Sequence, residues 1–344
     1  MKDNFVLFRY PGDTQCHMIE CDEARMLFLH DLDRVPESGC FVFAPYKLCG
    51  ELPIVVFPDD GIVDIPMSGL PCADIGLTLC GEVADRDSYA ADFSRFHAAV
   101  RAGKISKLVL SRKTAFGFEG EADIMAMFGR ACRMNRQSFV AVVGTRRTGT
   151  WLMATPEILL ERGGREWHTI ALAGTMPSVS GTAEPVWSDK NREEQRYVAD
   201  YIRETVGRYS GSIREHGPYT YNAGNIVHLR TDFYFTPVDG CVKAAEVASA
   251  LHPTPAVCGL PVGVAGRFIA GNETLDREYY SGFCGRLCKD GDFRLFVILR
   301  CMKLAADTAE LFAGGGILPD SREEEEWKET VSKMLVMKRI LTDS

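Results

Sequence analysis

The amino-acid sequence predicts an α+β protein in which large β-sheets are backed by helices. Three observations lead to this prediction. Strand-like and helix-like segments alternate in blocks along a chain of 344 residues. The composition is 46% hydrophobic and 25% charged, which is typical of a soluble globular protein. The chain also lacks a low-complexity linker and a short-period repeat.

The first part of the chain predicts short strands, and the first helix follows it. Residues 1–80 contain apolar runs such as CFVFAPY and LPIVVFP, which proline and glycine interrupt. Tyr89, Phe93 and Phe96 then recur at three- and four-residue steps, the spacing of one helix face. Gly103 ends this pattern, so we expect the helix to stop there.

The remaining elements continue the alternation. Segments rich in β-branched and aromatic residues predict strands at 107–116, 139–144, 150–164, 166–175, 225–235, 277–287 and 292–304. Helical periodicity predicts helices at 191–209, at 242–252 before Pro253, and at 321–333 near the C-terminus.

The charge and the cysteines exclude several classes of protein. A net charge of -8 argues against a general nucleic-acid-binding protein, which would present a basic surface. No apolar run approaches the ~20 residues of a membrane span, and no secretory leader opens the chain. The 12 cysteines form no C-x-x-C pair. We therefore expect reduced thiols in a cytoplasmic protein that binds neither nucleic acid nor membrane.

The C-terminal segment LFAGGGILPDSREEEEWKETVSK, residues 311–333, places glycines before a glutamate-rich helix. Ser321 predicts the N-cap of that helix, with Glu324 reaching back in a capping box. Acidic side chains in a first turn complement the helix dipole, so Glu323 needs no other function.

Glu326, Glu329 and Lys333 share one face of this helix at three- and four-residue spacing. Such a face is typical of a solvated surface helix. The glycines at 314–316 allow the backbone to approach a ligand closely, which favours the alternative of a site for a charged ligand. The segment alone leaves both interpretations open.

Three further residues have the chemistry of a charged site. Lys107 heads an apolar strand, where a lysine usually reaches the surface but becomes a usable base if buried. Glu157 follows a proline at a strand start, and a buried carboxyl there would donate a proton. Glu194 lies near the start of a helix. Glutamates from two helices beside a glycine-rich backbone suit Mg²⁺ and an anionic substrate.

Eight motifs, in order, connect the sequence to a known family. They are KLVLSR, TPEILLER, ALAGTMP, a K-x-R-x-E helix, LHPTPAVCGLP, DREYYSGFCG, VILRC, and AGGGILPDS with EWKETVSK, and they span residues 90–335. In these motifs the chain resembles the chorismate-utilising enzymes, most closely the isochorismate synthases. The resemblance implies the chorismate-binding-enzyme fold, in which two large, mostly antiparallel β-sheets pack together and are flanked by helices. It also implies a single domain over 1–344, with a divergent part at 1–85 and the characteristic catalytic part at 86–338.

The resemblance implies a role for each charged residue. Lys107 would be the general base on the attacking water, and Glu157 would protonate the departing hydroxyl. Glu194 and Glu329 match the family's Mg²⁺ ligands, and Glu326 would join the metal through a water molecule.

Other positions match the family's substrate contacts: Gly174, Thr175, Tyr280, Arg300, Gly314, Gly316 and Lys333. Ala256 matches a position beside the reacting part of the substrate. His252 matches a residue near the site, although a histidine there would equally serve as a helix C-cap. The chain departs from the family pattern at Asn191, where many relatives carry a second acid of the outer Mg²⁺ shell.

The implied reaction converts chorismate to isochorismate, with water adding at C2 and the C4 hydroxyl leaving. Amino-transferring relatives carry glutamine in place of Lys107, and salicylate synthases carry threonine in place of Ala256, so both are weaker alternatives. An inactive, metal-binding regulatory relative is disfavoured because every catalytic position is filled. A nucleotide site at the glycines lacks the G-K-[ST] that would follow. The resemblance implies a monomer, and it leaves open whether the product feeds menaquinone, siderophore or salicylate synthesis.

Overall fold

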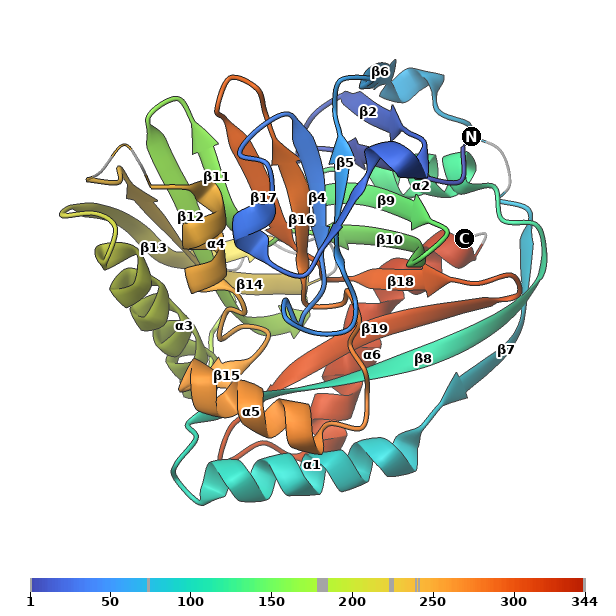
Figure 1. Ribbon diagram of the computed structural model, residues 1–344. Coiled ribbons are helices and arrows are strands. Elements are labelled where there is room, and N and C mark those ends of the chain that lie inside the picture. Colours follow the sequence, from blue (N-terminus) through green and yellow to red (C-terminus); the bar gives the residue numbers. More distant parts are fainter. Residues whose placement is uncertain are drawn as a thin grey trace.

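Two β-sheets pack against each other and carry helices on their outer sides (Figure 1). The computed structural model describes residues 2–72, 75–177, 185–222, 226–238, 240 and 242–342. Within this part of the chain the sheets have 10 and 9 strands, and their strand pairs are antiparallel, as in the ladders of β19 with β8 and β12 with β14. The predicted α+β fold with two large sheets is confirmed.

Sheet A has the strand order β15-β8-β19-β18-β10-β9-β1-β2-β6, and β7 pairs with β8 outside this path. Its strands are β1 (Phe5–Arg9), β2 (Gln15–Glu20), β6 (Val63–Pro66), β7 (Leu77–Ala84), β8 (Lys107–Gly120), β9 (Phe139–Thr145), β10 (Gly149–Thr155), β15 (Gly259–Leu260), β18 (Cys301–Leu304) and β19 (Thr308–Ile317).

Sheet B has the order β13-β14-β12-β11-β17-β16-β4-β5-β3. Its strands are β3 (Leu27–Leu29), β4 (Cys40–Ala44), β5 (Ile54–Pro58), β11 (Ile158–Gly163), β12 (Glu166–Pro177), β13 (Ile213–Asn222), β14 (Ile226–Phe235), β16 (Phe283–Leu287) and β17 (Phe293–Val297). Strands from the first 66 residues therefore enter both sheets.

Aromatic side chains fill the space between the sheets. Phe139 of β9 stacks on Phe296 of β17, with 4.2 Å between the ring centroids. Phe43 of β4 stacks on Tyr279 at 4.0 Å, and the buried Trp151 of β10 packs in the same cluster. Removal of these large apolar faces from water stabilises the two-layer arrangement.

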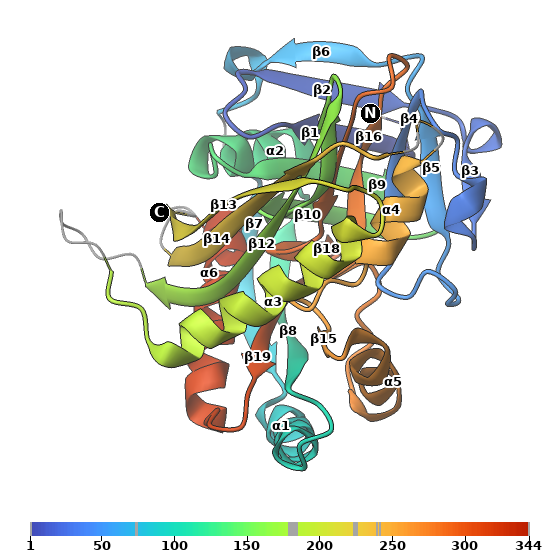
Figure 2. The same cartoon turned by 90° about the vertical axis from the view of Figure 1, so that its left-hand side faces the viewer.

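The helices cover the outer faces of the sheets and one end of the molecule. They are α1 (Arg86–Arg101), α2 (Ile124–Met134), α3 (Asp189–Gly207), α4 (Ala244–Leu251), α5 (Val262–Asn272) and α6 (Glu323–Leu341). α3 and α4 pack on sheet B, and α2 and α6 pack on sheet A. α1 and α5 lie together beyond the ends of β8, β15 and β19 (Figure 2). Three-residue 3-10 helices occupy Glu23–Arg25, Leu32–Arg34 and Met67–Gly69.

The helix ends confirm two predictions and correct one. α1 ends just before Gly103, which has a φ of +81°, and α4 ends just before Pro253, with His252 as its C-cap. The predicted N-cap of the C-terminal helix is wrong. α6 begins at Glu323 with Arg322 at the N-cap position and no side-chain cap. The Ser321 hydroxyl instead donates to Glu326 Oε1 over 2.7 Å and accepts from the Leu318 N–H over 3.0 Å, so other hydrogen bonds replace the capping box.

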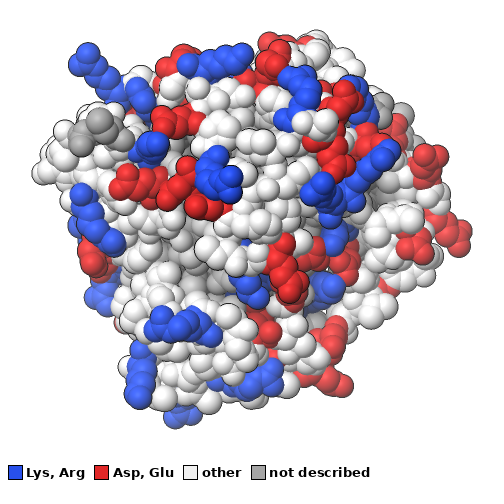
Figure 3. All heavy atoms as spheres, in the orientation of Figure 1, with Lys and Arg blue, Asp and Glu red and all other residues white. Residues whose placement is uncertain are grey.

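Charged side chains of both signs are interspersed on the face seen in Figure 3 and form no continuous basic field there. Among the described residues, no helix has both the length and the apolar character that crossing a membrane would require.

Candidate active site

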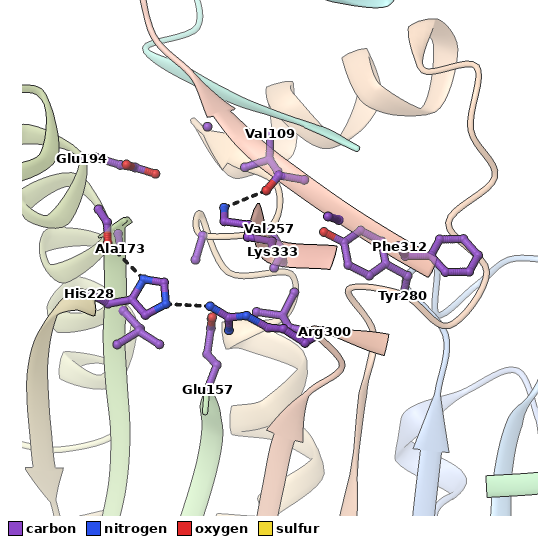
Figure 4. Close-up of a pocket in the computed structure, with 17 residues that line it drawn as sticks. Val109, Glu157, Ala173, Glu194, His228, Val257, Tyr280, Arg300, Phe312 and Lys333 are labelled. Atoms are coloured by element: carbon purple, nitrogen blue, oxygen red, sulfur yellow. Dashed lines mark hydrogen bonds between the residues drawn. The ribbon is translucent and has the colours of Figure 1, made fainter. Parts of the chain in front are cut away.

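A pocket lies where the glycine-rich end of β19 faces the ends of β12 and β14 (Figure 4). Most of the residues proposed from the sequence line it: Glu157, Gly174, Glu194, Ala256, Tyr280, Arg300, Gly314, Gly316 and Lys333. Val109 of the KLVLSR motif also lines it, so all eight sequence motifs converge on one cavity. The side chain of Thr175 lies outside the described residues.

Lys107 and Glu194 form an ion pair at one wall of the pocket, in which the glutamate side chain is 16% exposed. Lys107 begins β8 and is fully buried, and its Nζ lies 2.9 Å from Oε1 of Glu194 on α3. Within the described part of the chain this Nζ has no hydrogen bond of good geometry. Burial raises the pKa of Glu194, but the charges of Lys107, Lys333 and Lys190 outweigh burial and lower it overall. Glu194 is therefore a carboxylate near neutral pH.

Gly316 allows this ion pair to sit against β19. A Cβ atom at Gly316 would lie 2.7 Å from Glu194 Oε1 and 3.1 Å from Lys107 Cε. Any larger residue would displace one of the two charged groups, because real Cβ contacts are not that short. The glycine run thus lets the two charged side chains approach the backbone of β19 closely, as the sequence suggests.

Glu157 is a buried acid on another part of the pocket wall. It lies between β10 and β11 and is 3% exposed. Burial raises its pKa to about 7, against the opposing charges of Arg300 and Lys107. The Thr254 hydroxyl donates to Glu157 Oε1 over a long 3.4 Å. A carboxyl group with this pKa can hold a proton near neutral pH and give it to a leaving group.

His228 is a pocket residue that the sequence analysis missed. It lies on β14, and its Nδ1 is 3.0 Å from the Gly174 carbonyl oxygen. A carbonyl can only accept, so Nδ1 carries the hydrogen and Nε2 accepts from Arg300 Nη2 over 2.6 Å. Burial and then the charge of Arg300 lower the pKa of His228 well below its usual value, which keeps the ring neutral. The only signal in the sequence is a histidine within the strand NIVHLR.

His252 is not among the pocket-lining residues. It is the C-cap of α4, its ring is buried, and its Nε2 donates to the Tyr46 carbonyl oxygen over 2.9 Å. The sequence left two interpretations of His252 open, a helix C-cap and a residue near the site. The structure shows the C-cap. A direct role in substrate binding stays a prediction.

The glutamate-rich face of α6 borders the same site. Lys333 donates to the Gly314 carbonyl oxygen over 2.8 Å and pairs with Glu329 at 2.7 Å. Glu326 is 1% exposed, and its Oε1 accepts from Lys190 over 2.6 Å and from Ser321. Burial and then the nearby Glu329 raise the pKa of Glu326. Glu326 and Glu329 do not themselves line the pocket.

The three predicted metal ligands suit Mg²⁺ in kind. Carboxylate oxygens are its preferred protein ligands, and glycines let the carboxylates approach the strand. A Cβ at Gly315 would lie 3.0 Å from Glu326 Oε2, as one at Gly316 would crowd Glu194. In this structure each carboxylate is paired with a lysine, and the described residues contain no group of three acidic, histidine or cysteine side chains arranged to hold a metal.

Asn191 packs against the site through its backbone and Cβ. Gly174 has a φ of +71°, and a Cβ there would lie 3.2 Å from both the Cβ and the carbonyl oxygen of Asn191. The first turn of α3 therefore packs closely against β12. Position 174 requires glycine both because its φ is positive and because the space leaves no room for a Cβ atom.

Residues 76–342 match the model of the family described as chorismate binding enzyme, and the chain belongs to that family. The isochorismate synthase EntC of Escherichia coli is 29% identical over 263 residues, which are 74% of this chain and 67% of EntC.

Solved structures share the fold. The crystal structure of DhbC from Bacillus anthracis has a TM-score of 0.85 at 22% identity and covers 98% of this chain and 96% of DhbC. MenF, the menaquinone-specific isochorismate synthase from Escherichia coli, has a TM-score of 0.82 at 20% identity, over 98% of this chain and 89% of MenF.

Proposed function

We propose that this chain is an isochorismate synthase, which converts chorismate to isochorismate with the aid of Mg²⁺. We further propose that the protein is a cytoplasmic monomer and that its product serves menaquinone or siderophore synthesis. It is supported by the names of the relatives and by one observation above all. The pocket contains a buried acid, Glu157, whose pKa burial raises to about 7, and the candidate base Lys107 lies close enough for its charge to act on that acid.

The reaction needs a base and an acid at different ring carbons. Lys107 takes a proton from a water molecule as the water oxygen bonds to C2. The double bonds shift, and the C4 hydroxyl leaves with the proton that Glu157 supplies. One proton is taken up and one is released, so the overall change is an isomerisation. Placing both groups in a buried pocket supplies general acid–base catalysis on the order of 100- to 10,000-fold for each group.

The substrate's carboxylates need cationic partners. Arg300 lines the pocket, and its Nη1 is buried without a hydrogen-bond partner among the described residues. A buried donor without a partner is costly, so the site is arranged for an acceptor that arrives with the ligand. We assign this nitrogen to the enolpyruvyl carboxylate, because a guanidinium group pairs well with a carboxylate.

Glu194 and Glu329 would hold Mg²⁺ directly, with Glu326 joined through a water molecule. When bound, the ion would neutralise the ring carboxylate and stabilise the negative charge that develops during the reaction. Lys107 and Lys333 would then be released from their carboxylate partners and turn toward water and substrate.

Product analysis tests this function. The purified protein is incubated with chorismate and MgCl₂, and the products are separated by chromatography. We expect isochorismate, no pyruvate and no need for an ammonium source. Glu157→Gln provides the matched control, because it preserves shape but supplies no acidic proton. Unconsumed chorismate, or an aminated product, would contradict the proposal.

A further inference from the structure

Each carboxylate of the candidate metal site has its own lysine. Glu194 pairs with Lys107 at 2.9 Å, Glu326 with Lys190 at 2.6 Å, and Glu329 with Lys333 at 2.7 Å. Three negative and three positive charges therefore balance without an ion. We call Glu194, Glu326 and Glu329 the carboxylate cluster.

Lys190 differs from the other two lysines. Lys107 and Lys333 have roles toward water and substrate in the proposed reaction, and Lys333 lines the pocket. Lys190 does not line the pocket and has no role in that chemistry. The described contact of its ammonium group is with Glu326, which Lys190 reaches from a different helix.

The position of Lys190 is unfavourable for its own helix. It is the second residue of α3, where the helix dipole disfavours a positive charge. Its ammonium group nevertheless lies 2.6 Å from Oε1 of Glu326, in a partly buried ion pair. The carboxylate cluster, rather than the helix, therefore accounts for a cation at this position.

Glu326 shows what this cation does. The carboxylate is 1% exposed and lies near the second acid Glu329, an arrangement that is costly for two negative charges. Lys190 and Ser321 both donate to its Oε1, at 2.6 and 2.7 Å. The same oxygen therefore has two donors before any metal ion enters.

We propose that Lys190 is an internal counter-ion of the carboxylate cluster, which competes with the divalent cation and thereby sets how tightly the site binds it. This inference rests on the proposed function, because that proposal assigns the cluster to Mg²⁺. An ion that enters the cluster either displaces the ammonium group from Glu326 or binds against its repulsion. At separations of a few ångströms in a partly buried site, such repulsion is large.

Calorimetric titration with Mg²⁺ alone, without chorismate, tests the inference. Lys190→Met keeps the length of the side chain and removes its charge, so the dissociation constant for Mg²⁺ should fall by about tenfold or more. Lys190→Arg keeps the charge and should bind much as the unaltered protein does. Lys328→Met removes the same charge from an exposed position on α6, where Lys328 pairs with Glu324 at 3.5 Å, and should also leave the affinity unchanged.

A double variant controls for the loss of stability that the single substitution is expected to cause. Lys190→Met leaves Glu326 as a buried charge without its cation, which destabilises a protein strongly. Lys190→Met/Glu326→Gln removes both charges of the pair and should restore the melting temperature measured in EDTA. Because the net charge of the cluster is then unchanged, its Mg²⁺ affinity should return toward that of the unaltered protein.

Two results would overturn the inference. One is an affinity of Lys190→Met equal to or weaker than that of the unaltered protein. The other is equal tightening in Lys190→Met and Lys328→Met, which would show only a general effect of net charge. The titration needs no turnover, so it is independent of product analysis. If chorismate is not converted but Lys190→Met still binds Mg²⁺ more tightly, the function fails and the role of Lys190 stands.

Discussion

His228 and Arg300 form a directed pair in which Nε2 of the histidine lies 2.6 Å from Nη2 of the arginine. The direction is fixed because Nδ1 of His228 donates to the Gly174 carbonyl oxygen. Arg300 also has a φ of +43°, a left-handed conformation that a residue with a side chain rarely adopts. Such local strain is typical of functional sites. The histidine therefore holds the guanidinium group in place and leaves Nη1 for a ligand.

Replacing His228 by phenylalanine keeps the ring and removes the acceptor of Arg300. We expect kcat/KM for isochorismate formation to fall by roughly 5- to 150-fold, as for the loss of one partner of a buried charged donor. His252→Phe is the matched control, since that ring lies on α4 outside the pocket lining. It should lower the melting temperature and leave kcat/KM of the folded protein near normal. A larger kinetic loss at His252 than at His228 would reverse the assignment.

The raised pKa of Glu157 predicts a pH dependence. The proton donor is present below its pKa of about 7 and is lost above it, so kcat should decline by about tenfold per pH unit on the alkaline side. The stability of the folded protein depends on pH in the same direction. The folded protein binds this proton more tightly than the unfolded chain, so this group's contribution to stability is lost as pH rises from about 4.5 toward 7.

Glu157→Gln tests both effects. The variant should lose most of its turnover and should still bind chorismate, because the amide keeps the shape of the carboxyl group. Its free energy of unfolding should vary less between pH 5 and 7 than that of the unaltered protein, a range that lies within the shift of this group. A normal rate for Glu157→Gln would show that another group protonates the leaving hydroxyl.

Substitutions along α6 separate metal ligands from surface charges. Glu194→Ala and Glu329→Ala should each raise the Mg²⁺ concentration needed for half-maximal activity, because each removes one directly bound oxygen ligand. Glu323→Ala should be nearly silent, since Glu323 lies in the first turn and pairs with Arg86 on the surface. Equal Mg²⁺ requirements in Glu323→Ala and Glu329→Ala would mean that the acidic face of α6 is only a solvated surface.

Ala256 tests the choice between sister activities. It lines the pocket, and its methyl group offers no hydrogen bond. We expect the unaltered protein to release little or no pyruvate, and Ala256→Thr to raise the ratio of pyruvate to isochorismate. A coupled lactate dehydrogenase assay measures the pyruvate. Ala256→Val, which adds bulk without a hydroxyl group, is the control and should not raise the ratio. Stoichiometric pyruvate from the unaltered protein would identify a salicylate synthase.

The sequence predicted the pocket better than it predicted the elements that support it. Lys107, Glu157 and Arg300 could be chosen because each stands in a motif that resembles the chorismate-utilising enzymes, and Glu157 and Arg300 line one cavity with Lys107 beside them. His228 could not be chosen in this way. Its function depends on a partner 72 residues away, and nothing local distinguishes it from a buried strand histidine.

Two helices were missed for a related reason. α5 contains Gly263, Gly266 and Gly271, which lower helix propensity. The helix nevertheless forms, because Ala265 and Ile269 bury their side chains against α1 and β8. Packing of this kind overrides local preference. α2 likewise packs into the core of sheet A, although its periodicity was not recognised in the sequence.

The error at the start of α6 has the same origin. Ser321 followed by glutamates is a strong local signal for a cap. In the structure the serine hydroxyl serves Glu326, whose other donor is Lys190 from a distant helix. The carboxylate cluster, which no local pattern reveals, therefore determines the use of this serine.

The most direct test of the account follows the oxygen atom. Chorismate is converted in water enriched in the heavy isotope of oxygen, and the product is identified by chromatography with mass spectrometry. Because Lys107 is proposed to activate water, isochorismate should carry one heavy oxygen at its new hydroxyl group, and Lys107→Ala should form none above background. Isochorismate without the heavy oxygen, or labelled product formed at a normal rate by Lys107→Ala, would contradict the account.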